Sequence, residues 1–176
     1  MISFIRITHA THADLVQIKV LYETAFPLHE RRTWEALLKL LQEPGMELNS
    51  VKKDNNLIGF VIYWLLEGWL YLEHIAIEPV FHGQRLGTEV MAFLLKKANN
   101  KIILETETPA TEVAMRRIKF YEMAGLKVLP YSYKQPAYRK NEPAVEMAVM
   151  ASLPICREEF QQIRILIRKE VYERFY

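Results

Sequence analysis

The stretch of sequence that decides the fold is LYLEHIAIEPVFHGQRLGTEVM, which runs from Leu70 to Met91. Its first part is rich in apolar and β-branched residues, which is typical of a strand, and Pro79 ends that strand. A helical pattern follows from Thr88, and the loop between the two contains Gly83 and Gly87. This order predicts a strand, a glycine-containing turn and the start of a helix.

Such a helix start is suited to binding an anion. The first backbone N–H groups of a helix have no intrahelical partners, and the helix dipole is positive there. Gly83 and Gly87 carry no Cβ, so a phosphate can approach the backbone closely, and Arg85 adds a positive charge nearby. A turn that needs glycine only for positive φ is the alternative, because the segment is neither a GxGxxG motif nor a P-loop.

Outward from this loop, hydrophobic periodicity and turn residues predict the other elements. Strands are expected at residues 2–8, 48–53, 57–66, 69–77, 102–106, 126–133 and 144–150. Helices are expected at residues 11–25, 32–42, 88–98, 112–123 and 153–176. Hairpins come first and one strand–helix–strand unit follows. We therefore expect a mixed α/β fold of the α+β class, with a mixed, mostly antiparallel sheet of about seven strands, flanking helices and a C-terminal helix.

The composition is that of a globular protein, with 176 residues, 51% of them hydrophobic and 25% charged. The 23 basic and 21 acidic residues give a net charge of +2, which provides no bulk attraction to nucleic acid. The single cysteine, Cys156, excludes an intrachain disulfide and predicts a reducing compartment. No signal-peptide or transmembrane pattern is recognised, so a cytoplasmic location without membrane contact is expected.

Two further patterns have plain interpretations. His9 and His12 are three residues apart, but no set of Asp, Glu or Cys completes a metal site, so no metal is predicted. The segment from Tyr131 to Glu142 interleaves aromatic and basic residues, a pattern also found in RNA-binding segments. We interpret it as a mobile loop, because the near-neutral net charge argues against a nucleic-acid partner.

Three segments resemble the GNAT superfamily of N-acetyltransferases. FHGQRLGT, residues 81–88, resembles motif A (Gln/Arg-x-x-Gly-x-Gly/Ala), with His82 at the Gln/Arg position and Arg85 at the first glycine position. RRIKFYEMAGL, residues 116–126, resembles motif B (Ala-x-x-Phe-Tyr-Glu-x-x-Gly-Phe), although Ala114 stands where many members have asparagine. The third is FPxxER, residues 26–31, between the first two helices. The resemblance covers about residues 2–151.

The resemblance implies a GNAT-like fold, with a GNAT domain at residues 1–151 and a helical extension at 152–176 that packs on the same domain or on a partner subunit. It also implies acetyl-CoA (coenzyme A) as co-substrate without a metal, and direct transfer of the acetyl group to a primary amine in a ternary complex. The residues expected to contact the cofactor are Ile75, Ala76, Ile77, His82, Gly83, Gln84, Arg85, Leu86, Gly87, Thr88 and Phe120.

Catalytic roles follow from the same resemblance. Tyr121 matches the tyrosine that lies beside the thioester sulfur in relatives, and a phenol that is protonated at neutral pH can donate a proton to the departing thiolate. Glu73 and His74 are rival candidates for the general base. Alternation along the strand places them on opposite faces, and the sequence does not say which face points into the cleft.

The residues expected to contact the acceptor are Phe26, Glu30, Arg31 and Tyr133. A small-molecule amine and a protein or peptide amine both fit. The terminal helix has an apolar stripe, which can pack either on the chain's own core or against a second copy of the chain in a homodimer. An alternative function is a catalytically silent GNAT-fold module that binds an acyl-CoA as a sensor or interaction module.

Overall fold

The computed structural model describes residues 2–175. Its strands are β1 (Ile2–Ile7), β2 (Met46–Lys53), β3 (Asn56–Leu66), β4 (Trp69–Ile77), β5 (Ile102–Glu107), β6 (Lys127–Val128), β7 (Tyr133–Gln135) and β8 (Val145–Ala151). Its helices are α1 (Leu15–Ala25), α2 (Trp34–Lys39), α3 (Leu86–Lys97), α4 (Glu112–Met123) and α5 (Arg157–Ile167). Single turns of other helix types are η1 (Leu28–Glu30), η2 (Pro79–Phe81), η3 (Arg168–Tyr172) and η4 (Glu173–Phe175). Within these residues no helix is both long and apolar enough to cross a membrane.

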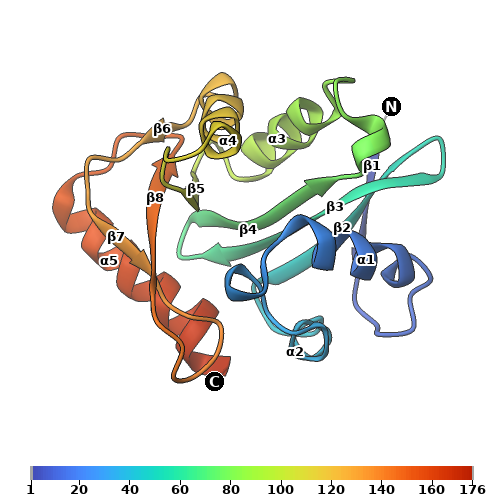
Figure 1. Ribbon diagram of the computed structural model, residues 1–176, viewed down its shortest axis with the longest axis horizontal. Helices are drawn as coiled ribbons and strands as arrows, with labels where there is room; N and C mark the ends of the chain where they lie inside the picture. Colours follow the sequence, from blue (N-terminus) through green and yellow to red (C-terminus); the bar gives the residue numbers. More distant parts are fainter. Residues whose placement is uncertain (1, 176) are drawn as a thin grey trace. The chain divides into compact units, whose positions relative to one another are not determined.

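The fold is α+β with mostly antiparallel strands, as the sequence predicts (Figure 1). Four elements have other boundaries than predicted, and the first is the helix expected at 11–25, which begins only at Leu15. The expected strand at 126–133 is two short strands, β6 and β7, separated by Pro130, which has no N–H for a strand ladder, so the described residues contain eight strands. The helix at 32–42 is only α2. The expected terminal helix begins at Arg157, after Pro154, and changes at Arg168 to the π-type turn η3.

The chain forms two compact units. The first unit comprises Leu72–Met91 together with the described residues up to Leu65, and the second comprises Leu66–Tyr71 together with the described residues from Ala92 onward. In the first unit, β1, β2 and β3 form an antiparallel meander, and β4 follows next to β3. The turn between β2 and β3 has positive φ at Asp54 and Asn55 (51° and 66°), as a type I′ hairpin turn requires.

Aromatic packing attaches α1 and α2 to the strands of the first unit. The ring of Tyr22, on α1, lies 5.9 Å from the ring of Phe60 on β3 and 5.3 Å from that of His74 on β4. It also lies 6.1 Å from the indole of Trp34 at the start of α2. All four side chains are buried, so this cluster is an aromatic core that includes the imidazole of His74.

In the second unit, β8 is the strand with which the others pair. β5 pairs with it antiparallel, and β6 and β7 pair with it as well. Figure 1 shows α5 running alongside β7 and β8, and the ring of Phe160 on α5 stacks 4.8 Å from that of Tyr131. The apolar stripe of the terminal segment, including Phe160, Ile163 and Ile167, is buried within the chain.

Gly59 on β3 marks a close approach of two backbones. A Cβ at this position would lie 2.2 Å from the carbonyl oxygen of Ala76 on β4, so the backbone itself would have to move. We expect Gly59→Ala to lower the free energy of unfolding by about 2 kcal/mol or more, because overpacking against backbone cannot be relieved by a rotamer change. Urea unfolding followed by circular dichroism measures it.

Gly68→Ala is the matched control, since Gly68 has positive φ (89°) but no atom within 4 Å of the added Cβ. Gly68→Ala should lower the free energy of unfolding by only about 1 kcal/mol, because alanine is disfavoured at positive φ. An equal loss in both variants would contradict the close approach of β3 and β4.

Candidate active site

The loop between β4 and α3 exposes a helix start. After η2, the side chains of His82, Gln84 and Arg85 are exposed, whereas Leu86 at the first position of α3 is 3% exposed and anchors the helix in the core. Gly83 has a φ of 80°, and a Cβ there would meet no atom within 4 Å. The space in front of the α3 N-terminus is therefore open to an anion of the size of a phosphate.

Arg85 adopts the backbone conformation of the glycine that it replaces in the motif. Its φ of 60° lies in the left-handed region, which costs an L-residue about 1–2 kcal/mol. The turn thus keeps the path that motif A requires, while the guanidinium adds a positive charge beside the helix start. This explains how the loop can tolerate the departure from the motif.

His82 ties the loop to the end of β4. Its Nε2 lies 2.7 Å from the carbonyl oxygen of Ile77. Since a carbonyl oxygen only accepts hydrogen bonds, Nε2 carries the hydrogen and donates it. Ala76 is buried, and Ile75 and Ile77 are half-buried, so the side chains of this strand end pack into the core.

Glu73 is the acidic partner in a buried ion pair. Its Oε1 lies 3.3 Å from Nε of Arg32, and the two side chains are 1% and 2% exposed. Its Oε2 accepts a hydrogen bond of 2.6 Å from Nε1 of Trp64. If Glu73 took up a proton, Arg32 would be left as a buried charge without a compensating carboxylate, which is costly.

His74 is buried beside this ion pair. Its Nε2 lies 3.0 Å from the carbonyl oxygen of Glu30, so Nε2 carries the hydrogen in the neutral ring and Nδ1 holds the lone pair. Nδ1 lies 4.0 Å from Oε1 of Glu73. Burial lowers the pKa of His74, and the nearby carboxylate of Glu73 only partly opposes this effect. His74 is therefore neutral at pH 7.

The predicted acceptor residues of the first unit lie around His74. The ring of Phe26, which ends α1, packs edge-on at 4.3 Å from the imidazole. Arg31 donates from Nε to the carbonyl oxygen of Phe26 (3.1 Å), and Glu30 lies 3.5 Å from His29. The structure thus brings Phe26, Glu30 and Arg31 together with both candidate bases.

Two residues of this cluster were missed in the sequence. Arg32 follows another arginine in a short connection, and Trp64 lies in an apolar strand, so neither position carries a local pattern. Their partner Glu73 is distant in sequence from both. Only the packed structure shows that the three side chains share one buried site.

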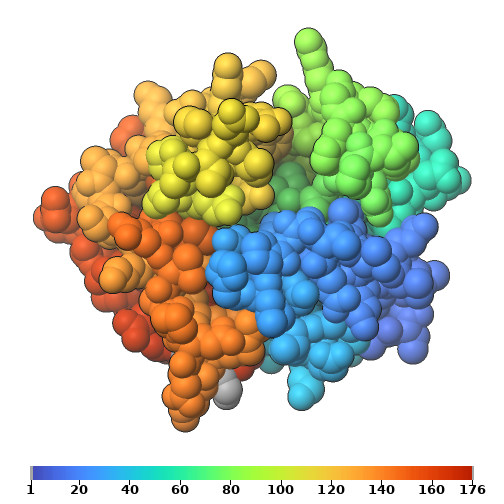
Figure 2. Space-filling model, viewed as in Figure 1, coloured from blue at the N-terminus to red at the C-terminus, as the bar shows by residue number. Residues whose placement is uncertain are grey.

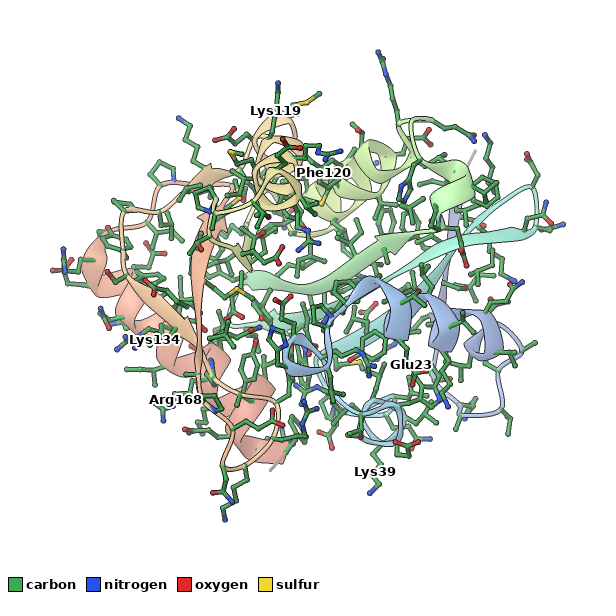
Figure 3. All side chains as sticks on the ribbon, in the orientation of Figure 1. Glu23, Lys39, Lys119, Phe120, Lys134 and Arg168 are labelled. Carbon is green, nitrogen blue, oxygen red and sulfur yellow. The ribbon has the colours of Figure 1, made fainter. Side chains whose placement is uncertain are left out.

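Phe120 and Tyr121 lie in the second unit, on α4. Tyr121 is 7% exposed, and burial raises the pKa of its phenol to about 12, with the nearby Arg117 opposing. The hydroxyl is therefore a proton donor at neutral pH. Phe120, labelled in Figure 3, is half-buried, and its ring lies 5.1 Å from that of Tyr121. In Figure 2 other side chains of α4, in yellow, form part of the visible surface.

Tyr133 borders a cavity in the second unit. It lines a cavity of about 550 Å³ between the β7–β8 hairpin and α5, together with Lys134 and Arg168, which Figure 3 labels. Its hydroxyl, however, donates to the carboxylate of Glu105. Among residues 2–175 no three His, Cys, Asp or Glu side chains gather in a way that could hold a metal ion.

The pH dependence of stability should report the burial of His74. Because its folded-state pKa is lowered, the unfolded chain takes up a proton first as the pH falls. Stability is thus complete above a pH of about 6.5 and is lost below it, by up to about 1.4 kcal/mol per pH unit. Urea unfolding of wild type and His74→Gln between about pH 7.5 and 5.5 should show a smaller slope in the variant.

His29→Gln provides the control, because the side chain of His29 is 60% exposed. Its slope should equal that of the wild type. A wild-type slope in His74→Gln would show that His74 is not the group whose titration is coupled to folding.

Comparisons with known proteins agree with this geometry. A protein from Bacteroides thetaiotaomicron, assigned as an acetyltransferase of the GNAT family, superimposes with a TM-score of 0.89 and 28% identity over 97% of this chain and 98% of its own. Arabidopsis thaliana Naa50, in complex with the bisubstrate analogue CoA-Ac-MVNAL, gives a TM-score of 0.61 at 16% identity over 87% of this chain and 99% of its own.

A GNAT-family acetyltransferase from Elizabethkingia anophelis with acetyl-CoA bound gives a TM-score of 0.57 at 15% identity, covering 85% of this chain and 95% of its own. These last two likenesses show the fold alone. No curated protein matches the sequence at a significant level. The model of the acetyltransferase (GNAT) family matches residues 14–126, which is well over half of the sequence, and the chain therefore belongs to the GNAT acetyltransferase family.

Proposed function

We propose that this chain is an acetyl-CoA-dependent N-acetyltransferase that transfers an acetyl group to a primary amine by direct attack in a ternary complex. The observation that carries the proposal is the exposed start of α3, where Gly83 and Arg85 both have positive φ in a segment matched to the family. Solved structures of the same fold contain acetyl-CoA or a CoA-based analogue. The acetyl thioester supplies an activated acyl group.

The residues present fit such a cofactor. The segment from His82 to Thr88 offers the backbone N–H groups of an exposed helix start and the charge of Arg85 to the pyrophosphate. The backbone of Ile75, Ala76 and Ile77 is assigned to the pantetheine arm, and an N–H at Ile75 or its neighbour to the developing oxyanion. The contact between His82 and Ile77 holds both segments in place.

Of the two candidate bases, we favour His74. Its Nδ1 holds a lone pair, and the imidazolium formed when it takes the amine's proton is stabilised by the Glu73 carboxylate 4.0 Å away. Glu73 is held by Arg32 and Trp64, so proton uptake there would break a buried ion pair. In this proposal Glu73 orients and stabilises His74, and Tyr121 donates its proton to the departing thiolate.

The second candidate function is binding of an acyl-CoA without turnover, as a sensor or interaction module. Ala114 favours it, because this buried position carries no polar side chain where many relatives have asparagine. For the acceptor, a small-molecule amine and a protein or peptide amine remain the two classes proposed. A cytoplasmic location is proposed because the one cysteine, Cys156, is an exposed free thiol.

Cofactor binding is tested by thermal unfolding. At about 100 times its Kd, acetyl-CoA should add about 2.7 kcal/mol and raise Tm by roughly 5–10 °C in a chain of this size. CoA should act similarly, and ATP and NADH should leave Tm unchanged. Equal shifts with all four ligands, or none with acetyl-CoA, would refute the assignment of the loop.

Turnover is tested with Tyr121→Phe. We expect kcat for amine acetylation, followed by thiol release, to fall by about 10- to 100-fold, because the proton donor for the thiolate is lost. The acetyl-CoA shift in Tm should persist. Tyr131→Phe is the control, since its hydroxyl donates to the backbone carbonyl oxygen of Ile155 and has no role in the proposed site. Acetyl-CoA binding without turnover of any amine by the wild type would favour the sensor.

A further inference from the structure

Glu105, on β5 in the second unit, is enclosed by tyrosine hydroxyls. Tyr133 donates to its Oε1, and Tyr172 donates to its Oε2 at 2.7 Å. The hydroxyl of Tyr172 also accepts a hydrogen bond of 2.8 Å from Nε2 of Gln135 and lies 2.9 Å from the hydroxyl of Tyr71. We call these five residues the Glu105 cage. It draws on β4, β5, β7 and the π-type turn η3.

The carboxylate of the cage is surrounded by neutral groups. No ion pair among residues 2–175 includes Glu105, in contrast to Glu107 two residues later, which pairs with Arg117 at 2.7 Å. Burial raises the pKa of Glu105, and the hydrogen bonds from Tyr133, Tyr172, Tyr71 and Gln135 oppose this effect. A charge held in such surroundings without a cationic partner is costly.

A second acceptor of the cage also lacks a donor. Gln135 is 5% exposed, and its Oε1 has no hydrogen-bond partner in the described part of the chain. A buried acceptor without a donor costs free energy, and each such group calls for an explanation. Among the described residues, the cage therefore combines a carboxylate without an ion-pair partner and an amide oxygen without a donor.

A protonated primary amine supplies that donor. Its ammonium group has three N–H bonds and, like the side chain of lysine, stays charged at neutral pH. The ring of Tyr138 packs 4.9 Å from that of Tyr172, so a further aromatic side chain borders the cage. Tyr133, one of the residues of the cage, also lines the cavity of about 550 Å³ between the β7–β8 hairpin and α5, which gives a small ligand a place beside the cage.

We propose that the Glu105 cage binds the ammonium group of a small organic amine, through Glu105 and Oε1 of Gln135. This deepens the proposed function by naming the class of acceptor, a cationic alkylamine, and its identification as the acceptor rests on that function. Amine binding itself does not depend on turnover and can be measured without acetyl-CoA.

The test is isothermal titration calorimetry of the full chain at neutral pH with butylamine and 1,4-diaminobutane, and with butan-1-ol and butyrate as neutral and anionic controls. Wild type should bind at least one amine saturably and neither control. Glu105→Gln removes the charge at almost constant shape and should weaken amine binding about tenfold or more. Glu107→Gln, on the same strand but in a partly exposed ion pair with Arg117, should bind like the wild type.

Gln135→Met is the second variant and carries the test if Glu105→Gln does not fold cooperatively. It keeps the carboxylate but removes the unsatisfied oxygen, and amine binding should weaken about threefold or more. Unchanged amine affinity in either folded variant, or no saturable amine binding by the wild type, overturns the proposal.

The same samples separate this inference from the proposed function. Glu105→Gln should keep the acetyl-CoA-induced rise in Tm of the wild type. Amine binding that depends on Glu105 in a protein that does not respond to acetyl-CoA supports the cage and refutes the acetyltransferase proposal. A rise in Tm with acetyl-CoA without amine binding at Glu105 supports the acetyltransferase proposal and refutes amine binding by the cage.

Discussion

The buried ion pair between Arg32 and Glu73 is the constraint on which the candidate site of the first unit depends. Both side chains are almost fully excluded from water, so the attraction between them has to offset a large desolvation cost. The hydrogen bond from Trp64 satisfies the second carboxylate oxygen. The ion pair attaches the segment that precedes α2 to strand β4. It also places the negative charge of Glu73 beside His74. Burial lowers the pKa of His74 and the Glu73 carboxylate opposes this effect, and the ion pair that fixes this carboxylate involves no residue of a recognised motif.

The parts of the structure that the sequence predicts are those governed by local rules. The loop before α3 could be predicted because glycine spacing, a strand end and a helix start all leave marks in neighbouring residues. The turn at Asp54 and Asn55 could be predicted for the same reason, since a type I′ turn demands residues that tolerate positive φ. The element order, and with it the α+β class, follows from these local signals in sequence.

The remaining features depend on contacts between distant residues. Alternation along β4 separates Glu73 from His74 but does not reveal that Arg32 and Trp64 hold Glu73. The terminal segment has helical periodicity throughout, yet it changes to a π-type turn at η3, where Tyr172 reaches the carboxylate of Glu105. Periodicity records which side of an element is buried, and it contains no information about the partner on the other side.

Glu73 and Glu105 show two ways in which a carboxylate can be buried. One is paired with a cation of the chain and supports the fold, and the other lacks such a partner and is a candidate binding group. Glu73 has a guanidinium 3.3 Å from its Oε1 and an indole N–H on its Oε2, so its charge is compensated by a cation within the chain. Among residues 2–175 the hydrogen-bond donors to Glu105 are neutral, and Oε1 of Gln135 in the same cage has no donor. Evolution has little reason to bury a carboxylate among tyrosines if the fold alone is to be stabilised, because an apolar side chain of similar volume would serve better. An incomplete polar cluster of this kind is best explained by a ligand that completes it.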